Sequence, residues 1–222
     1  MTGDMVVETA ERVVAGAVEL AGDLALPADA RGVVVFAHGS GSSRHSPRNR
    51  QVAKAFHRAG YATLLLDLLT AEEGETDERT RQLRFDIAML ADRLTGAVDW
   101  LSGRRDTGPL PIAVFGASTG AAAALVTAAN RPKLVRLVIS RGGRPDLAGA
   151  ALTRVVAPTL LIVGGADEEV LRLNRAAAAR MSADVDLQIV PGASHLFPEP
   201  GALEDVIGLA LAALDRYLPA RR

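Results

Sequence analysis

The sequence has no cysteine among its 222 residues. A disulfide framework, a thiolate zinc site and a cysteine nucleophile are therefore excluded. It also lacks any apolar run approaching the roughly eighteen residues that a membrane-spanning helix needs. The first ten residues, MTGDMVVETA, carry acids where a secretory signal would carry a basic segment and then an apolar one. These absences predict a soluble protein of the cytoplasm.

A surplus of charge of one sign is also missing. The formal net charge is −1, which gives no electrostatic reason to expect nucleic acid or an anionic membrane as a partner. Hydrophobic residues at 49% and charged residues at 23% are typical of soluble globular proteins. The length favours one domain over residues 1–222 and is compatible with a monomer or a homodimer.

Short apolar runs recur along the chain and predict buried strands. They are residues 33–36, 63–66, 112–115, 135–139, 159–163 and 187–190. Residues 13–26, broken at Ala15-Gly16 and closed by Pro27, predict a hairpin ahead of them.

Stretches with helical spacing lie between and after these runs. Residues 83–101 and 203–214 repeat apolar side chains every three or four positions, and Pro47 is typical of the first residue of a helix. This alternation predicts an α/β fold with three layers: a mostly parallel sheet, helices on both faces and an N-terminal antiparallel hairpin. The acidic segment 71–78 is predicted to be a solvated loop, and no segment is long enough for a lid domain.

The segment GASTG, residues 116–120, follows a predicted strand and precedes an alanine-rich stretch. In a doubly wound sheet, ligands bind beyond the carboxyl ends of the strands. Glycines two positions before and after a serine allow a sharp strand-to-helix turn that exposes the serine hydroxyl at the helix N-terminus. Ser118 is therefore a candidate nucleophile, and the alternative is a polar residue in a tight turn.

A serine nucleophile needs a histidine base. The chain has four histidines: His38 directly follows a strand, His45 lies in an arginine-rich loop, and His57 lies in a predicted helix. His195, in PGASHLF, follows the strand at residues 187–190. We predict that His195 is the base, because it follows a late strand of the sheet.

The base in turn needs an acid to orient it. Asp167 lies beyond the strand at residues 159–163, with Glu168 and Glu169 beside it. All three could be acids of a first helical turn, which the helix dipole favours. Asp167 is nearest the strand end and follows two glycines, so we predict that it is the orienting acid.

The oxyanion of a tetrahedral intermediate needs backbone donors. We predict the N–H of Thr119, the residue after the serine, and the N–H of Ser40 in the loop after the first parallel strand. The alternative for HGSGS is a flexible turn without a function.

Further candidates for substrate binding surround these residues. Arginine forks match carboxylate or phosphate, and the segments SRHSPRNR and SRGGRPD follow strands. The alternative is that these arginines pair with Asp67, Asp146 or the acidic loop. The candidates for substrate contact are His38, Arg44, Arg48, Arg141 and Arg144.

The segments HGSGSSRHSPRN, GASTG, GGADEEV and GASHLF, in that order, resemble the α/β-hydrolases of the dienelactone hydrolase group. The resemblance covers nearly the whole chain. It implies a lidless α/β-hydrolase with a nucleophile, an acid and a histidine, and with no metal and no organic cofactor. Dienelactone hydrolases proper use a cysteine, and Ser118 stands in that place. Ester hydrolysis is still expected, but the departure weakens the case for a dienelactone substrate.

Two classes of function follow. The first is a serine hydrolase of small esters, thioesters or lactones, acting through Ser118, Asp167 and His195; acyl transfer would use the same residues. The second is a binding or partner domain that keeps the fold without catalysis. The presence of all three residue types in the expected order favours the hydrolase.

Overall fold

The computed structural model describes residues 6–219, which form an eight-stranded sheet with the strand order β1-β2-β4-β3-β5-β6-β7-β8. β1 and β2 form an antiparallel hairpin, β2 also pairs antiparallel with β4, and the strands from β4 to β8 run parallel. The expected hairpin and parallel sheet are both confirmed. The strands are β1 Val6–Ala15, β2 Val18–Pro27, β3 Val33–Ala37, β4 Ala62–Leu66, β5 Ile112–Ala117, β6 Val135–Arg141, β7 Thr159–Gly164 and β8 Val185–Val190.

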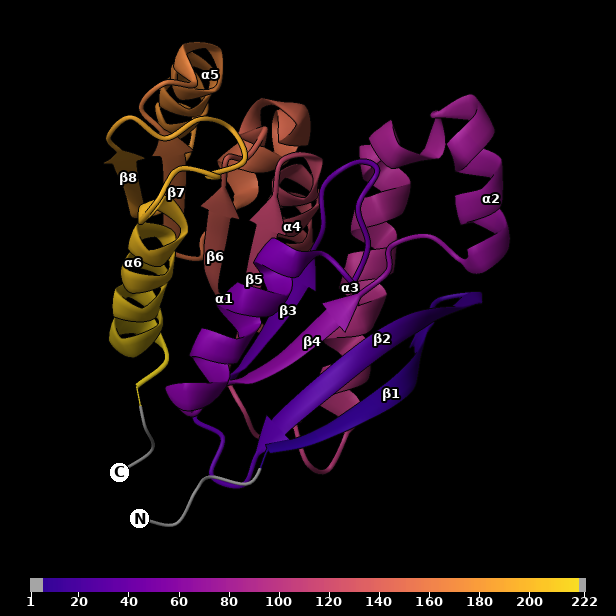
Figure 1. Ribbon diagram of the computed structural model, residues 1–222. Helices are drawn as coiled ribbons and strands as arrows, with labels where there is room; N and C mark the ends of the chain where they lie inside the picture. The colour runs from indigo at the N-terminus through magenta and orange to yellow at the C-terminus, as the bar shows by residue number, and fades with distance from the viewer. Residues whose placement is uncertain (1–5, 220–222) are drawn as a thin grey trace.

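Helices cover the sheet on both faces (Figure 1). The α1 and α6 helices pack on one face, while α3, α4 and α5 contribute to the core on the other. The three-layer prediction is therefore confirmed. The helices are α1 Pro47–Arg58, α2 Ala71–Thr80, α3 Ile87–Gly103, α4 Thr119–Asn130, α5 Glu168–Ala178 and α6 Ala202–Tyr217, with 3₁₀ segments η1 Leu83–Phe85 and η2 Pro145–Arg154.

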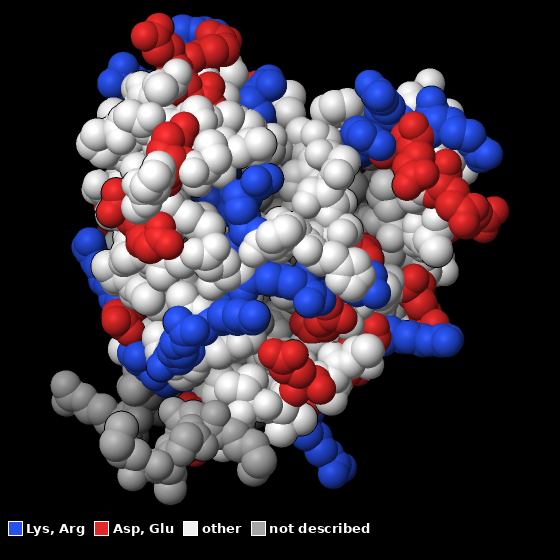
Figure 2. Space-filling model, in the orientation of Figure 1, with Lys and Arg blue, Asp and Glu red and all other residues white. Residues whose placement is uncertain are grey.

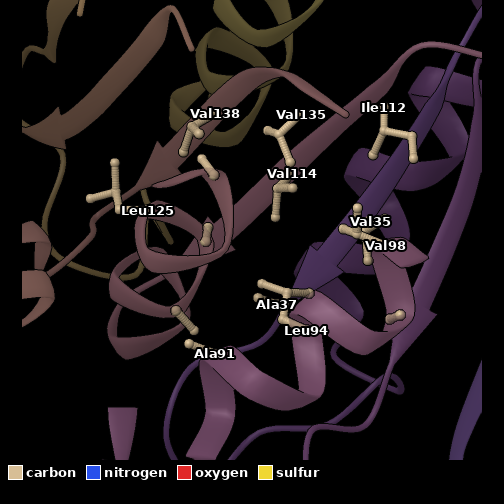
Figure 3. Packing of buried hydrophobic residues seen from close by; sticks show 14 of the residues in the cluster. Val35, Ala37, Ala91, Leu94, Val98, Ile112, Val114, Leu125, Val135 and Val138 are labelled. Carbon is tan, nitrogen blue, oxygen red and sulfur yellow. The ribbon is translucent and has the colours of Figure 1, made fainter. Parts of the chain in front are cut away.

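The central strands bury side chains on both faces, which explains their continuous apolar sequences. In β3, Val33 and Val35 face the α3/α4 layer, whereas Val34 and Phe36 face the α1/α6 layer. This alternation follows from the two-residue period of a strand. Figure 3 shows Val35 beside Val98 of α3, in the core of the α3/α4 layer.

The prediction that residues 71–78 form a loop is wrong, because they belong to α2. Thr70 caps this helix: its hydroxyl accepts from the N–H of Glu73, and the Glu73 carboxylate accepts from the N–H of Thr70. The acids at the start of the segment also interact favourably with the helix dipole. Asp77 is buried and pairs with Arg84, so this segment is more than a solvated charge run.

The helix expected at residues 83–101 is divided in the structure. Residues 83–85 form η1, and α3 begins at Ile87 because the Asp86 carboxylate caps it by accepting from the N–H of Met89. The helix expected at residues 203–214 is present as α6, and Pro47 is the first residue of α1. No helix within residues 6–219 is both long and apolar enough to cross a lipid bilayer.

Candidate active site

Ser118 occupies a strained turn between β5 and α4. Its φ of 50° and ψ of −120° are unusual for a residue with a side chain. Three backbone hydrogen bonds hold this conformation. The Ser118 N–H donates to the carbonyl of Arg141 (3.3 Å), and the Ser118 carbonyl accepts from the N–H groups of Ala121 (3.1 Å) and Arg144 (3.0 Å). The half-buried serine is thus fixed at the carboxyl end of the central strand.

The two glycines around Ser118 are required by close backbone contacts. A Cβ atom at Gly116 would lie 2.4 Å from the Cα of Ala121, and one at Gly120 would lie 2.3 Å from the carbonyl oxygen of Ala37. Real Cβ atoms do not approach other atoms so closely. The G-x-S-x-G spacing therefore allows α4 to begin tight against the end of β3.

Asp167 and His195 lie in the loops that follow β7 and β8, and the structure brings them together. Nδ1 of His195 is 2.7 Å from Oδ2 of Asp167. Their loops cross closely: the N–H of Ala166 donates to the carbonyl of Ala193 (2.9 Å), and a Cβ at Gly164 would lie 2.2 Å from that same oxygen. Because Nδ1 faces the carboxylate, Nε2 is the ring nitrogen left for another partner.

The turn after β6 connects the serine with the imidazole. Its Arg141 carbonyl binds the N–H of Ser118, as described above. The next residue, Gly142, has a φ of +52°, and a Cβ there would lie 2.9 Å from the carbonyl oxygen of His195 and 3.7 Å from its ring carbon Cε1. Ser118 and His195 are therefore both in contact with the same two-residue turn.

The loop after β3 contacts the serine from another side. A Cβ at Gly39 would lie 3.1 Å from the Cβ of Ser118. The N–H groups of Ser40 and Thr119 have no protein acceptor among the hydrogen bonds formed within residues 6–219. Thr119 is the first residue of α4, where a helix leaves N–H groups unpaired. Both residues line the same large groove.

This groove has a volume of about 1140 Å³ and extends away from the serine. Its walls include the loop 38–47, residues of the β1–β2 hairpin, Asp77 of α2 and Arg84 of η1. Sequence reasoning missed the contribution of α2, although the pair Thr70 and Glu73 is the signature of a capping box. The groove gives the site more room than a short-chain ester would fill.

His38 lies at the edge of this groove, with both ring nitrogens bonded to the backbone. The N–H of Leu68 donates to Nε2 (3.2 Å), so Nδ1 carries the proton and donates to the carbonyl of Gly39 (2.9 Å). Burial lowers the pKa of His38, which is consistent with a neutral ring. His38 thereby links the loop after β3 to the end of β4, and its contact with substrate stays a prediction.

The other two histidines have partners elsewhere. Nε2 of His57, on α1, is 2.6 Å from the hydroxyl of Thr63, and Nδ1 of His45 is 3.2 Å from the guanidinium of Arg50. No cluster of three or more His, Asp or Glu side chains that could hold a metal ion occurs in the part of the chain that the structure describes.

Two of the four candidate arginines form ion pairs. Arg44 pairs with Asp67, and its Nε lies 3.4 Å from Asp23. Arg144 makes a two-pronged contact with Asp146, at 2.8 and 2.7 Å. The remaining two, Arg48 and Arg141, have no acidic partner among residues 6–219.

The sheet order, the strained serine turn and the carboxylate–imidazole pair define an α/β-hydrolase fold. The comparison with known families agrees: residues 20–213 match the model of the dienelactone hydrolase family, so this chain belongs to that family. The resemblance seen in its motifs is confirmed.

Three similar proteins illustrate what this chain resembles. A dienelactone hydrolase from Anabaena variabilis has 56% sequence identity and a TM-score of 0.94, covering 97% of this chain and 99% of that one. A lidless α/β serine hydrolase from Xanthomonas campestris, 22% identical with a TM-score of 0.76 and 97% of each chain covered, shares the fold. A putative phosphoribosyl transferase of Mycobacterium tuberculosis H37Rv is 59% identical over 199 residues, which are 90% of this chain and 44% of that protein. The chain thus spans less than half the length of this curated relative.

Proposed function

We propose that this protein is a serine hydrolase that cleaves carboxylic esters, thioesters or lactones of small molecules through an acyl-enzyme on Ser118. The observation that carries the proposal is the 2.7 Å contact between Asp167 and His195, whose loops meet beside the turn that holds the serine. Membership of the dienelactone hydrolase family supports hydrolysis as the reaction class.

In the first half of the proposed reaction, Nε2 of His195 takes the proton of the Ser118 hydroxyl as its oxygen attacks the carbonyl carbon. The Asp167 carboxylate accepts from Nδ1–H, which keeps Nε2 unprotonated before attack and stabilises the imidazolium afterwards. The oxyanion accepts hydrogen bonds from the N–H groups of Thr119 and Ser40, at the positive end of the α4 dipole.

The first half ends when the imidazolium of His195 gives its proton to the leaving alcohol or thiol and the acyl group stays on Ser118. The second half repeats these roles with water. A water molecule then loses a proton to His195 as it attacks the acyl carbon. Collapse of the second tetrahedral intermediate returns the proton to Ser118 and releases the carboxylic acid.

The large groove beside Ser40 and Thr119 would receive the part of the substrate beyond the scissile carbonyl. It opens next to the proposed oxyanion donors, and its lining residues do not include the serine. A substrate would therefore reach the nucleophile from one end of the groove.

A panel of 4-nitrophenyl esters of increasing acyl length tests the proposal. The wild-type protein should release nitrophenol in a saturable manner, and Ser118→Ala should lose at least about 10³-fold in kcat/KM. If the wild-type protein hydrolyses none of the esters, or if Ser118→Ala is equally active, the proposal is wrong.

Acyl transfer would use the same residues, with an alcohol in place of the water that attacks the acyl-enzyme. The two reactions differ in product: adding a primary alcohol at increasing concentration would divert the acyl group into a new ester. Under the hydrolase proposal, free acid remains the main product in water.

A further inference from the structure

Arg141, the last residue of β6, is a buried cation without an acidic partner. Its exposed fraction is 6%, its Nη1 has no hydrogen-bond acceptor, and it forms no ion pair within the described chain. Burial, with a smaller contribution from the charge of Arg48, lowers the pKa of Arg141 to about 10, so the guanidinium is still charged at neutral pH. A buried charge costs free energy unless it is paired.

Arg48 adds a second unpaired cation at the same place. It lies in the first turn of α1, one turn before Val52 on the same helix face, and Val52 packs in the α1/α6 core. Its Nε is also buried without an acceptor. Two cations that repel each other, next to the positive end of a helix, create a strong local preference for an anion.

The side chain of Arg141 points toward this helix. Leu137 and Ile139 precede it at two-residue spacing on β6 and face the α1/α6 layer. The Arg141 guanidinium lies 5.9 Å from the ring centre of Phe115, which belongs to the same core. Figure 2 shows Lys and Arg side chains gathered over α1 on this face of the molecule.

Arg141 also lies close to the proposed nucleophile. Arg141 is opposite Ala117 in the pairing of β5 with β6, and its carbonyl binds the N–H of Ser118. The next residue, Gly142, packs against His195. An anionic group bound by the two guanidinium groups would therefore belong to a molecule held at Ser118.

We propose that Arg141 and Arg48 form a binding site for an oxyanion, a carboxylate or phosphate, carried by the ester that Ser118 cleaves. This inference rests on the proposed function for the position of the ester, while the anion site itself depends only on the two arginines. The planar guanidinium fork can donate two parallel hydrogen bonds to either group. Arg44 and Arg144 are paired with acids in the folded protein, so the site excludes them.

The test compares two esters with acyl chains of equal length: 4-nitrophenyl hexanoate and the 4-nitrophenyl half-ester of adipic acid, which replaces the terminal methyl with a carboxylate. The wild-type protein should show a higher kcat/KM for the half-ester. Arg141→Met and Arg48→Met should each lower the ratio of the two kcat/KM values by about 10- to 100-fold, since a hydrogen bond to a charged group contributes that much. The ratio is the readout, because the Arg141 carbonyl also holds the Ser118 turn and the rate with either ester alone does not isolate the contact with the anion.

The matched control is Arg58→Met, an exposed arginine of the last turn of the same helix, about 15 Å from Arg48 along α1. It should leave the ratio unchanged. Equal turnover of both esters by the wild-type protein, or an unchanged ratio in Arg141→Met and Arg48→Met, would overturn the inference. Because Arg141→Met removes an unpaired buried charge, it should fold; thermal unfolding at or above the wild-type temperature checks this.

A binding measurement separates failure of this inference from failure of the proposed function. Calorimetric titration of Ser118→Ala with the adipate half-ester should show binding that weakens at least about tenfold in Ser118→Ala/Arg141→Met. That result would support the anion site even if the wild-type protein cleaved no ester. Binding of the half-ester to Ser118→Ala that is no tighter than binding of 4-nitrophenyl hexanoate, or that is equal in Ser118→Ala and Ser118→Ala/Arg141→Met, would contradict it.

Competition identifies which anion fits. Adipate and inorganic phosphate are each added to the hexanoate assay of the wild-type protein and of Arg141→Met. If adipate inhibits the wild-type protein more strongly than Arg141→Met, the site binds a carboxylate. If phosphate does so, the site binds a phosphate. Each anion is raised to the concentration at which ionic strength alone begins to change the rate. If neither anion inhibits in that range, the result counts against the site.

Discussion

His195 and Asp167 are 28 residues apart in the chain and share a hydrogen bond of 2.7 Å between Nδ1 and Oδ2. The carboxylate is the more buried partner, with 17% of its side chain exposed against 38% for the imidazole. The acid is therefore largely shielded from water, while the imidazole is more exposed. This asymmetry suits an acid that orients a base.

Replacing Asp167 with Asn should lower kcat/KM by about 10³- to 10⁴-fold while the fold is retained. An amide can donate to Nδ1, which would place the ring proton on Nε2 and leave no base for Ser118. Steady-state hydrolysis of a 4-nitrophenyl ester measures the loss. Glu168→Gln, an exposed neighbour, is the control and should keep most of the activity; an equal loss there would reject Asp167 as the orienting acid.

Replacing Ser118 with Gly should increase stability while activity is lost. The φ of 50° costs a residue with a side chain about 1–3 kcal/mol, and glycine adopts it freely. Urea denaturation should therefore give a higher free energy of unfolding for Ser118→Gly than for Ser118→Ala, because alanine keeps the backbone strain. If alanine is as stable as glycine at this position, the turn stores no strain.

Gly120→Ala should destabilise the protein by about 1–3 kcal/mol or more, because the new methyl group would meet the carbonyl oxygen of Ala37. Gly208, on α6, is the matched control, since a Cβ there meets nothing within 4 Å. Gly208→Ala should stabilise by about 0.5–1 kcal/mol through helix propensity. Chemical denaturation of the two variants should give opposite signs; equal signs would contradict the close packing of α4 on β3.

Stability should fall as the pH drops below 6.5, the ordinary pKa of histidine, partly because of His38. Burial lowers the pKa of His38 in the folded state, so between the lowered pKa and 6.5 the unfolded chain binds more protons than the folded one. Above 6.5 this contribution to stability is complete. Burial also lowers the pKa of His57, which acts in the same direction.

His38→Gln tests this pH dependence. Glutamine can accept the hydrogen bond from the N–H of Leu68 and does not titrate, so the variant should lose less stability than the wild-type protein between about pH 7 and about pH 5. Urea unfolding at both pH values measures the difference, and the exposed His45→Gln is the control. Equal losses in His38→Gln and the wild-type protein would show that His38 does not contribute.

The sheet and the candidate site could be predicted because both correspond to short, local patterns in the sequence. Runs such as residues 33–36 are apolar throughout, since each strand is covered on both faces. Ser118, Asp167 and His195 could be selected because each follows a strand, and the carboxyl ends of parallel strands lie at one edge of the sheet.

Two features were not predicted, for different physical reasons. The helix at residues 71–80 is strongly polar, and it depends on a cap at Thr70 and on the pairing of Asp77 with the later Arg84. Its acidic composition suggested a loop, and only the spacing of Thr70 and Glu73 indicated a helix start. All four candidate arginines lie in segments at or beyond the ends of predicted strands, and only the fold decides that Arg44 has an acidic neighbour and Arg141 has none.

The most direct test of the account is the intact mass of the protein after treatment with a small fluorophosphonate, measured on the wild-type protein and on Ser118→Ala. An activated serine reacts with this probe, and an ordinary surface serine does not. The account predicts one adduct on the wild-type protein and none on Ser118→Ala. A folded wild-type protein without an adduct, or an equal adduct on Ser118→Ala, would contradict the assignment of Ser118 as the nucleophile and favour a binding role for this fold.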